Sequence, residues 1–405
     1  MDSGSLLNFC SRYPLQPACR QAGLFFVPHK SLSVRFGGDF HFYRAARGEN
    51  IFIQLFLSNR SALTHDINKL IIYLYLVKIR SIRINNFKSL LNFELTEPNP
   101  FSVFVGANGV GKSNIFEALE YFNYKNFNKW NETDELFGGY KNFVNYNHYG
   151  DDVSIFIEPV NGIPLGIERI AYEGIEPTAG KVRESLTSMN PANPEIQFQK
   201  QFVENFTRIF INSKEGNKLN LSVSDKKLNF NADNLEFVLN RILQSGNIEI
   251  KEWLNLLRPG FSDLKIERDL SERPQLQFYE KNFTAPFGKK LISDGTFNIL
   301  CLLTAIYQIK EPQFLCIEEP ENGLNPYVIK ELIAFFREQC KENGHYIWLN
   351  THSQTLVNLL EPEEIIIINK KAGITTPKQM TKMNLHGLPM DEAWLTNVLG
   401  GGVPW

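Results

Sequence analysis

The stretch GANGVGKS at residues 106–113 has the residue types and spacing of a phosphate-binding loop, G-x-x-x-x-G-K-[ST]. Its glycines allow the backbone to approach a phosphate closely, and successive N–H groups supply partial positive charge. Lys112 can reach the β- and γ-phosphates of a nucleoside triphosphate, and the Ser113 hydroxyl can ligate Mg²⁺. A chance glycine turn is the structural alternative, which the flanking elements disfavour. The stretch therefore predicts a site for ATP and Mg²⁺.

Two adjacent carboxylates, Glu318 and Glu319, follow the short apolar run FLCI at residues 314–317. Such a run is typical of a strand buried in a parallel sheet, and these folds bind ligands at the carboxyl ends of their strands. We expect Glu318 to hold Mg²⁺ together with Ser113, and Glu319 to polarise the attacking water. An EEPE string by itself is more often a charged loop. Behind a buried strand, and with a phosphate loop upstream, the catalytic interpretation is favoured.

Two further polar features complete the candidate site. His352 follows the apolar run YIWL at residues 346–349 and can contact the γ-phosphate, although a histidine that caps a turn is the structural alternative. The turn SDGT at residues 293–296 precedes an apolar helical pattern, and Ser293 can cap that helix and leave N–H groups free to face an anion. This turn alone is weak evidence for an anion-binding site. Its position strengthens the interpretation, because only one helix separates it from the strand before Glu318. We expect Lys112, Glu319 and His352 to be catalytic.

Hydrophobic periodicity indicates the elements that would hold these residues. The run FSVFV at residues 101–105 predicts a strand before the phosphate loop, and apolar residues at helical spacing predict a helix after it. Strands at 314–317 and 346–349, and a helix after the SDGT turn, extend an α/β pattern. Residues 151–290 mix strand-like and helical stretches without a sustained heptad repeat, so we expect an inserted lobe and no coiled-coil arm.

Composition narrows the class of protein. A chain of 405 residues with formal net charge −2 and 43% hydrophobic residues suits a soluble globular protein. The near-neutral balance argues against a wide basic surface for non-specific DNA binding, although a local DNA-binding patch stays open. Five cysteines without CxxC pairing form no zinc or disulfide framework and favour a cytoplasmic location. The most apolar run, at residues 70–77, is far shorter than a membrane-spanning helix, so no membrane association is expected.

In their order along the chain, these motifs resemble those of ABC-type ATPases of the RecF and SMC class, and more narrowly those of compact bacterial ATPases of AAA type. The resemblance covers residues 77–369 in two stretches, and it includes an N-F-K-S turn at residues 86–89. Residues 106–113 match Walker A, Glu318 and Glu319 match Walker B and the catalytic glutamate, and residues 293–296 match the signature motif. The predicted nucleotide-binding residues are Lys88, Gly106, Asn108, Gly109, Val110, Gly111, Lys112, Ser113, Asn114, Ser293, Asp294 and Gly295.

The resemblance implies a P-loop NTPase head of ABC type: an α/β fold with a mostly parallel central sheet, an antiparallel β subdomain and an inserted lobe that carries the signature. Two such heads sandwich two ATP molecules, and each site combines Walker A, Walker B and the histidine of one head with the signature turn of the other. We therefore expect an ATP-dependent homodimer that acts as a nucleotide-dependent switch. The expected parts of the chain are residues 77–150 with Walker A, an insert at 151–290, the remaining ATPase core at 291–371 and a packed tail at 372–405.

Two features depart from the family pattern. Walker B usually begins with aspartate, whereas this chain has Glu318. A glutamine-bearing loop usually follows Walker A, yet no glutamine occurs between Ser113 and Ile196, and the loop at residues 135–147 lies where the glutamine is expected.

Residues 1–76 show no sustained hydrophobic period, and two interpretations are equally open for them: an over-extended gene start or a poorly patterned extension.

The leading hypothesis is an ATPase that dimerises on ATP and hydrolyses it to reset a switch. The resemblance implies a role in DNA repair, or in antiphage defence with an effector from a neighbouring gene, and the sequence does not choose between them. A hypothesis of another class is a non-hydrolysing binding scaffold, suggested by the Walker B glutamate and the missing glutamine. The ATP-binding subunit of a transporter is a weaker third interpretation, because SDGT replaces the usual LSGGQ.

Overall fold

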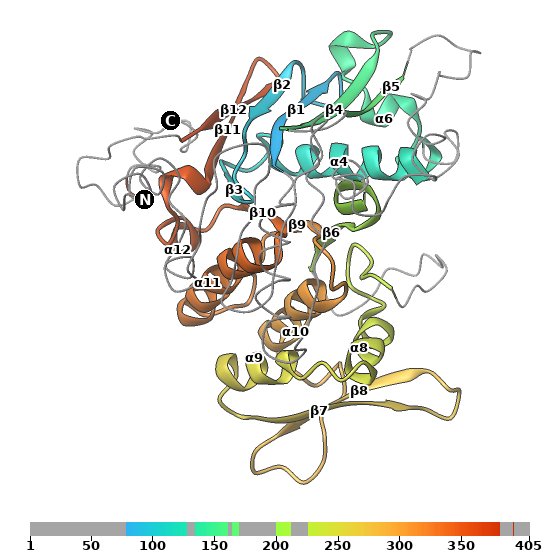
Figure 1. Ribbon diagram of the computed structural model, residues 1–405, viewed down its shortest axis with the longest axis vertical. Helices are drawn as coiled ribbons and strands as arrows, with labels where there is room; N and C mark the ends of the chain where they lie inside the picture. Colours follow the sequence, from blue (N-terminus) through green and yellow to red (C-terminus); the bar gives the residue numbers. More distant parts are fainter. Residues whose placement is uncertain are drawn as a thin grey trace, which may run out of the picture. The chain divides into compact units, whose positions relative to one another are not determined.

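The computed structural model describes residues 78–127, 134–160, 164–169, 200–211 and 226–380, together with Glu392 (Figure 1). All of these residues lie in one compact unit of the chain, Ile72–Trp405. The extension predicted at residues 1–76, the apolar run at 70–77 and most of the predicted tail lie outside the described residues. Within the described ranges, no helix is both long enough and apolar enough to cross a membrane.

Six strands form the central sheet, in the order β12-β11-β3-β10-β9-β6. Their bounds are β3 (Phe101–Val105), β6 (Phe206–Phe210), β9 (Phe314–Glu318), β10 (Tyr346–Thr351), β11 (Ile365–Lys371) and β12 (Ile374–Gln379). All pairings in this sheet are parallel except that of β12 with β11. The mostly parallel sheet confirms the predicted fold class, and it brings the carboxyl ends of β3, β6, β9 and β10 to one edge.

Helices cover both faces of the central sheet (Figure 1): α4 (Lys112–Phe127) covers one, and α10 (Asp294–Tyr307) and α11 (Pro326–Asn343) cover the other. Val103 packs in a buried cluster with α10 and α11, whereas Phe104 packs in a second cluster with α4. Residues 314–317 and 346–349 alternate between the two clusters in the same way. Because successive side chains of a strand point to opposite faces, these strands are buried on both sides, which explains their uninterrupted apolar runs.

A second, antiparallel sheet has four strands in the order β2-β1-β4-β5. These are β1 (Ile79–Asn85), β2 (Phe93–Thr96), β4 (Val153–Pro159) and β5 (Leu165–Arg169). Along β4, Val153, Ile155 and Ile157 are buried and the residues between them are half-buried. The buried side chains join the cluster that contains α4, so this sheet packs on the helix that follows the phosphate loop. It is the antiparallel subdomain that the resemblance implied.

The lobe that precedes the SDGT turn consists of two helices and a two-stranded ribbon. The helices α8 (Leu235–Gln244) and α9 (Glu249–Leu257) pack on α10, and β7 (Phe261–Arg268) pairs antiparallel with β8 (Pro274–Glu280). Neither helix is long enough for a coiled-coil arm. Within the predicted insert at 151–290, β4 and β5 belong to the antiparallel sheet and β6 belongs to the central sheet. The division of the chain into domains stays a prediction.

Local sequence signals explain where the long helices begin and end. The Asn325 side chain accepts a hydrogen bond from a backbone N–H in the first turn of α11 (3.0 Å), Pro326 follows it, and Gly344 ends the helix with a φ of 69°. Ser293 caps α10 in the same way, at 3.1 Å. The short elements are α6 (Tyr140–Phe143), α12 (Gln354–Val357), a π-helical turn at Lys200–Glu204 and 3₁₀ turns at Tyr146–His148 and Pro362–Glu364.

Candidate nucleotide-binding site

The phosphate loop joins β3 to α4 at the carboxyl edge of the central sheet. Gly109 and Gly111 have φ values of 77° and 103°, which favour glycine. A Cβ on Gly111 would also lie 2.3 Å from Thr375 Oγ1. The Lys112 ammonium is buried and donates to two carbonyls of the loop, at 2.7 and 3.0 Å. Burial lowers the pKa of Lys112, while nearby carboxylates oppose this shift. The loop thus has the backbone shape and the cation that phosphate binding needs.

The hairpin of β11 and β12 supports the phosphate loop. Thr375 Oγ1 donates to the Val110 carbonyl at 2.7 Å and lies 2.6 Å from Ser89 Oγ. Lys370 Nζ donates to the Gly109 carbonyl at 3.3 Å. Because Thr375 is fully buried, its hydroxyl holds the loop where water has no access. The conformation of the loop therefore depends on a strand far away in the sequence.

The structure brings Glu318 and Ser113 together. Ser113 Oγ donates to Glu318 Oε2 at 2.5 Å, and Asn350 Nδ2 donates to the same oxygen at 3.1 Å. The other oxygen, Oε1, accepts from Arg208 Nε at 2.7 Å and lies 2.6 Å from its Nη2. A hydroxyl and a carboxylate oxygen are the donors that Mg²⁺ prefers, so Ser113 and Glu318 fit a magnesium site. That they hold the metal stays a prediction.

Glu319 lies just beyond β9 with a φ of 47°, a left-handed conformation that is rare for residues other than glycine. Its N–H donates to the backbone oxygen (3.0 Å) and to Oδ1 (3.1 Å) of Asn350. Its carboxylate accepts from Asn322 Nδ2 at 3.1 Å and lies 3.4 Å from His352 Nδ1. These contacts hold the strained backbone in place. The Glu319 and His352 side chains are 30% and 46% exposed, so both can meet a ligand.

A third carboxylate, Glu321, adds to the negative charge of the site. It accepts a hydrogen bond from the Thr351 hydroxyl, and in the described part of the chain its Oε2 has no hydrogen-bond partner. Burial raises the pKa of Glu321, while the Thr351 hydroxyl works against this shift. All three glutamates of this segment attract the Lys112 ammonium. A triphosphate that enters this acidic site therefore depends on cations to offset the repulsion.

The turn at residues 86–89 packs against α4. Lys88 pairs with Glu117 of α4 at 2.5 Å, and Asn114 Nδ2 donates to Ser89 Oγ at 2.8 Å. The loop at residues 135–147, where the family's glutamine is expected, binds this turn, because Asn145 Nδ2 donates to the Lys88 carbonyl at 2.6 Å. Among the described residues, no hydrogen bond joins that loop to the Ser113 or Glu318 side chain.

The SDGT turn lies against the loop that follows Glu319. A Cβ on Gly295 would lie 2.4 Å from a carbonyl oxygen of residues 320–324, so glycine permits this close approach. Asn298 Nδ2 donates to two carbonyls of the same loop, at 3.0 and 2.8 Å. Ser293 and Asp294 are exposed. Over the described ranges, no hydrogen bond joins Ser293 to the phosphate loop of its own chain.

Sequence reasoning missed three residues that shape the site: Arg208, Asn350 and Thr375. The first two had a usable signal, since each is a polar residue within or at the end of an apolar run, FTRIF for Arg208 and YIWLN for Asn350. A polar group at such a position is buried and needs a partner. Thr375 lies in the ordinary strand ITTPKQ, and no local signal separates it from Thr376.

Two protein-family models match the chain. One is described as an AAA ATPase domain and matches residues 78–231. The other is described as "AAA domain, putative AbiEii toxin, Type IV TA system" and matches residues 185–358. Between them the two matches include the phosphate loop, the SDGT turn, both glutamates and His352.

The chain is also similar to individual proteins. An ATP/GTP phosphatase of Helicobacter pylori (strain ATCC 700392 / 26695) is 23% identical over 325 residues, which cover 70% of this chain and 87% of the relative. The solved SmcHead bound to the C-winged helix domain of ScpA is 16% identical with a TM-score of 0.49, and the match covers 76% of this chain and 99% of that one. The SMC head domain from Thermotoga maritima is 12% identical with a TM-score of 0.41, with 75% and 99% covered.

The family matches and the phosphatase relative agree with the fold. The phosphate loop lies between β3 and α4, and Glu318 and Glu319 lie at the carboxyl end of β9 in the same sheet, an arrangement that suits ATP hydrolysis. The alternative of a scaffold that binds ATP without hydrolysing it is therefore not supported. The chain is a P-loop ATPase whose residues 78–231 and 185–358 match AAA-type ATPase domains, and it binds and hydrolyses ATP.

Proposed function

We propose that this ATPase dimerises on ATP and acts as a switch that hydrolysis resets. The observation that carries the proposal is the exposed turn at Ser293 and Asp294, which begins α10 and is packed on the loop after Glu319. The first N–H groups of a helix bind anions well. The signature turn is thus available to the γ-phosphate bound by a second copy of the chain. ATP would join the two copies, and its cleavage would release them.

The proposed roles within one head follow from the geometry. Lys112 would bind the β- and γ-phosphates, and Ser113 with Glu318 would hold Mg²⁺, which would neutralise phosphate charge when bound. Glu319 would accept a hydrogen bond from the attacking water and polarise it. Asn350 fixes the backbone of Glu319 and thereby sets the direction of that carboxylate. His352 lies beside Glu319 and would contact the γ-phosphate.

We further propose that the switch serves DNA repair, or antiphage defence with a separately encoded effector. The description of the family that matches residues 185–358 names an AbiEii toxin and a Type IV TA system, and it supports the branch with a separate protein partner. Expression of the chain together with the products of its neighbouring genes tests this choice. ATP-dependent co-purification with one of those products is expected. A chain that binds and is stimulated only by DNA would contradict the effector branch.

The dimer is tested by measuring mass in solution for Glu319→Gln with Mg-ATP and without nucleotide. This substitution keeps the shape of the side chain but removes the carboxylate, so the protein is expected to bind ATP without cleaving it. A doubling of mass in Mg-ATP is the expected result, since the trapped state cannot reset. A mass that is the same with and without ATP contradicts the switch.

The signature turn is tested by Ser293→Arg, with Ser271→Arg as the control. Ser271 is exposed in the same lobe, at the tip of the β7–β8 ribbon. The Ser293→Arg protein is expected to bind ATP as a monomer but to lose the ATP-dependent dimer and the turnover that needs it. The Ser271→Arg protein is expected to dimerise like wild type. If Ser293→Arg also dimerises like wild type, the turn does not face a second copy.

A further inference from the structure

Arg208 joins three elements at the carboxyl edge of the central sheet. It lies on β6, which pairs in register with β9. Its Nε and Nη2 lie 2.7 and 2.6 Å from Glu318 Oε1, and its Nη1 lies 2.7 Å from Glu120 Oε2 on α4. The guanidinium carbon also lies 4.6 Å from the centre of the Phe230 ring, and the side chain is 10% exposed. Arg208 is therefore held on several sides and largely closed to water.

The two carboxylates that Arg208 binds come from different parts of the ATPase core. Glu120 lies on the helix that follows the phosphate loop, and Glu318 ends the strand that carries the proposed magnesium ligand. Without the guanidinium, the buried Glu318 and the half-buried Glu120 would repel each other, and both would repel an incoming triphosphate. The planar fork of an arginine can satisfy two carboxylates at once, which a lysine ammonium does less well.

We propose that Arg208 is a positioning residue for the ATPase reaction. It holds Glu318 through Oε1, so that Oε2 remains beside Ser113 on the side where Mg²⁺ would bind. Arg208 acts only through Glu318 and Glu120, and it touches neither phosphate nor water in this scheme. The inference rests on the proposed roles of Ser113 and Glu318 as metal ligands.

This role also explains why a glutamate suits position 318. The two carboxylate oxygens of Glu318 accept hydrogen bonds from different groups. Oε1 accepts from Arg208 of β6, and Oε2 accepts from Ser113 and Asn350. Aspartate is one methylene shorter, so its carboxylate would be drawn back toward β9 and away from one of these groups. Arg208 and the longer side chain therefore form a matched pair.

Nucleotide affinity measured with and without Mg²⁺ tests the proposal. A fluorescent ATP analogue is titrated into wild type, Arg208→Lys and Arg208→Met, in MgCl₂ and in EDTA, and kcat is measured alongside. Arg208→Lys keeps the charge but loses the fork, so the Mg²⁺-dependent gain in affinity and kcat should both fall roughly 10- to 100-fold. Its affinity in EDTA should stay close to wild type. Arg208→Met should also bind less tightly in EDTA, because it lacks the charge.

The control is Arg337→Met, which removes a similar pair elsewhere. Arg337 binds both carboxylate oxygens of Glu364, at 2.6 and 2.7 Å. This variant should lose stability but keep the wild-type dependence on Mg²⁺. If Arg208→Met behaves in the same way, or if Arg208→Lys shows wild-type Mg²⁺ dependence and kcat, the proposal is overturned.

Two further variants separate the inference from the proposed function. Because Arg208 acts through Glu318, the double variant Arg208→Lys/Glu318→Asp should lose about as much Mg²⁺-dependent affinity as either single variant. Effects that simply multiply would overturn the pairing. Lys112→Ala should lose most of its nucleotide affinity. If Lys112→Ala binds nucleotide with wild-type affinity, the proposed nucleotide site itself is refuted. If Lys112→Ala loses affinity but Arg208→Lys keeps the wild-type dependence on Mg²⁺, only the proposed role of Arg208 is refuted.

Discussion

The carboxyl ends of the parallel strands bury charged groups, whereas the amino ends of β9 and β10 bury neutral groups. The carboxyl end holds charged side chains: Lys112 and Glu318 are buried, Arg208 is 10% exposed, and Glu319 has a left-handed backbone conformation. Several of their contacts involve atoms that a nucleotide or a metal would engage, such as the Ser113 hydroxyl on Glu318. When a nucleotide or a metal binds, contacts with that ligand would replace some of these side-chain contacts.

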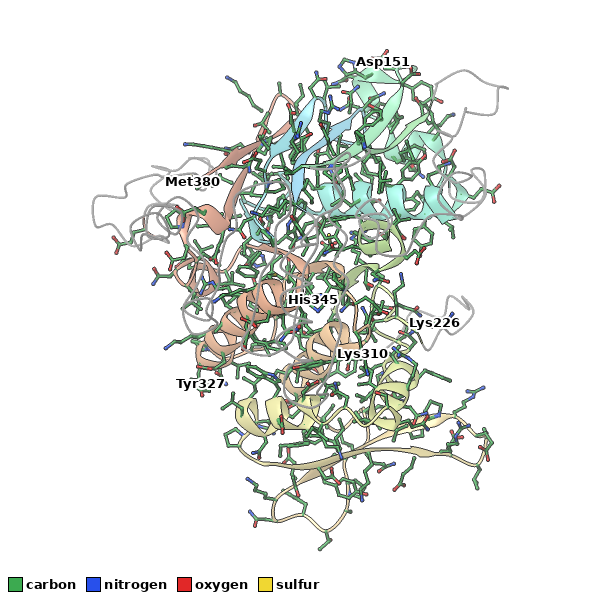
Figure 2. All side chains as sticks on the ribbon, in the orientation of Figure 1. Asp151, Lys226, Lys310, Tyr327, His345 and Met380 are labelled. Carbon is green, nitrogen blue, oxygen red and sulfur yellow. The ribbon has the colours of Figure 1, made fainter. Side chains whose placement is uncertain are left out.

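The amino ends of β9 and β10 bury neutral groups that bond to one another and to the backbone. Gln313 donates through its N–H to His345 Nδ1 at 3.1 Å and through Nε2 to a backbone carbonyl of α10 at 2.8 Å. Its Oε1 accepts from Gln308 Nε2 at 3.1 Å. A cavity of about 1110 Å³ opens beside this end, and His345 and Lys310 are among its lining residues (Figure 2). The bonds of this network join the protein's own neutral groups.

The difference shows how one sheet separates stability from function. A buried neutral network costs little desolvation once its bonds are made, so it serves the fold. Buried charges cost more, and those at the carboxyl end lie where a charged substrate would bind. We expect substitutions at the carboxyl end to change turnover more than stability, and substitutions at the amino end to do the reverse.

The largest expected effect is that of Glu319→Gln at the carboxyl end. Turnover should fall roughly 10²- to 10⁴-fold, the usual contribution of a general base. Phosphate release and thermal unfolding are measured on the same preparation. The unfolding temperature should change little, because the amide can still accept from Asn322. Turnover within tenfold of wild type would show that Glu319 is not the group that activates water.

At the amino end, acidification should destabilise the protein through His345. Burial lowers the pKa of His345 to about 4, while the unfolded histidine has a pKa near 6.5. Between these values the unfolded state binds more protons, so stability falls as pH is lowered from about 6.5 toward 4. The loss attributable to this group is about 3 kcal/mol at the acid end of the window.

The measurement is urea unfolding of wild type and His345→Asn at pH 7 and at pH 4.5. Asparagine keeps an acceptor near the Nδ1 position but does not titrate, so its stability should fall less on acidification. His148→Asn is the control, since His148 is 39% exposed. If wild type and His345→Asn lose the same free energy of unfolding between pH 7 and pH 4.5, protonation of His345 does not destabilise the protein.

A smaller loss of turnover is expected for Asn350→Asp than for Glu319→Gln. This variant tests whether a residue that positions the glutamates matters less than the proposed catalytic glutamate. The new carboxylate cannot donate to Glu318 and adds like charge beside it, so turnover should fall roughly 10- to 100-fold. Asn358→Asp adds the same charge at an exposed position nearby and should leave turnover unchanged. If the two variants are equally active, the Asn350 side chain does not position the glutamates.

The smallest expected effect is that of Thr375→Val beneath the phosphate loop. Losing the bonds to Val110 and Ser89 should cost on the order of 1 kcal/mol, or about fivefold in nucleotide affinity. Thr376→Val, at the exposed neighbouring position, is the control. Calorimetric titration with ATP compares the two. Unchanged affinity in Thr375→Val would mean that the hairpin does not set the shape of the loop.

The sequence was informative where the chemistry is local. The pattern around Lys112 predicted a strand, a loop and a helix, and the apolar runs before Glu318 and His352 predicted buried strands, all of which the structure confirms. In these cases a short segment determines both its own conformation and its motif. The roles of the individual site residues stay predictions.

The sequence did not predict contacts that depend on the order of strands in the sheet. Arg208 reaches Glu318 across 110 positions because β6 is the neighbour of β9. Thr375 reaches Val110 because β11 pairs with β3 and β12 folds back on β11. The left-handed backbone of Glu319 likewise depends on Asn350 of the adjacent strand. Periodicity predicts which strands exist but not which strands become neighbours.

The place of β3 in the sheet has a consequence for biosynthesis. Both of its neighbours, β10 and β11, lie far downstream in the chain. As the protein leaves the ribosome from its N-terminus, the segment with the phosphate loop appears long before the strands that flank it and the threonine that steadies it. ATP binding at this site is therefore acquired late, after β12 has been made. If the proposed dimer is correct, a partly synthesised chain has no ATP-bound surface with which to bind a second copy.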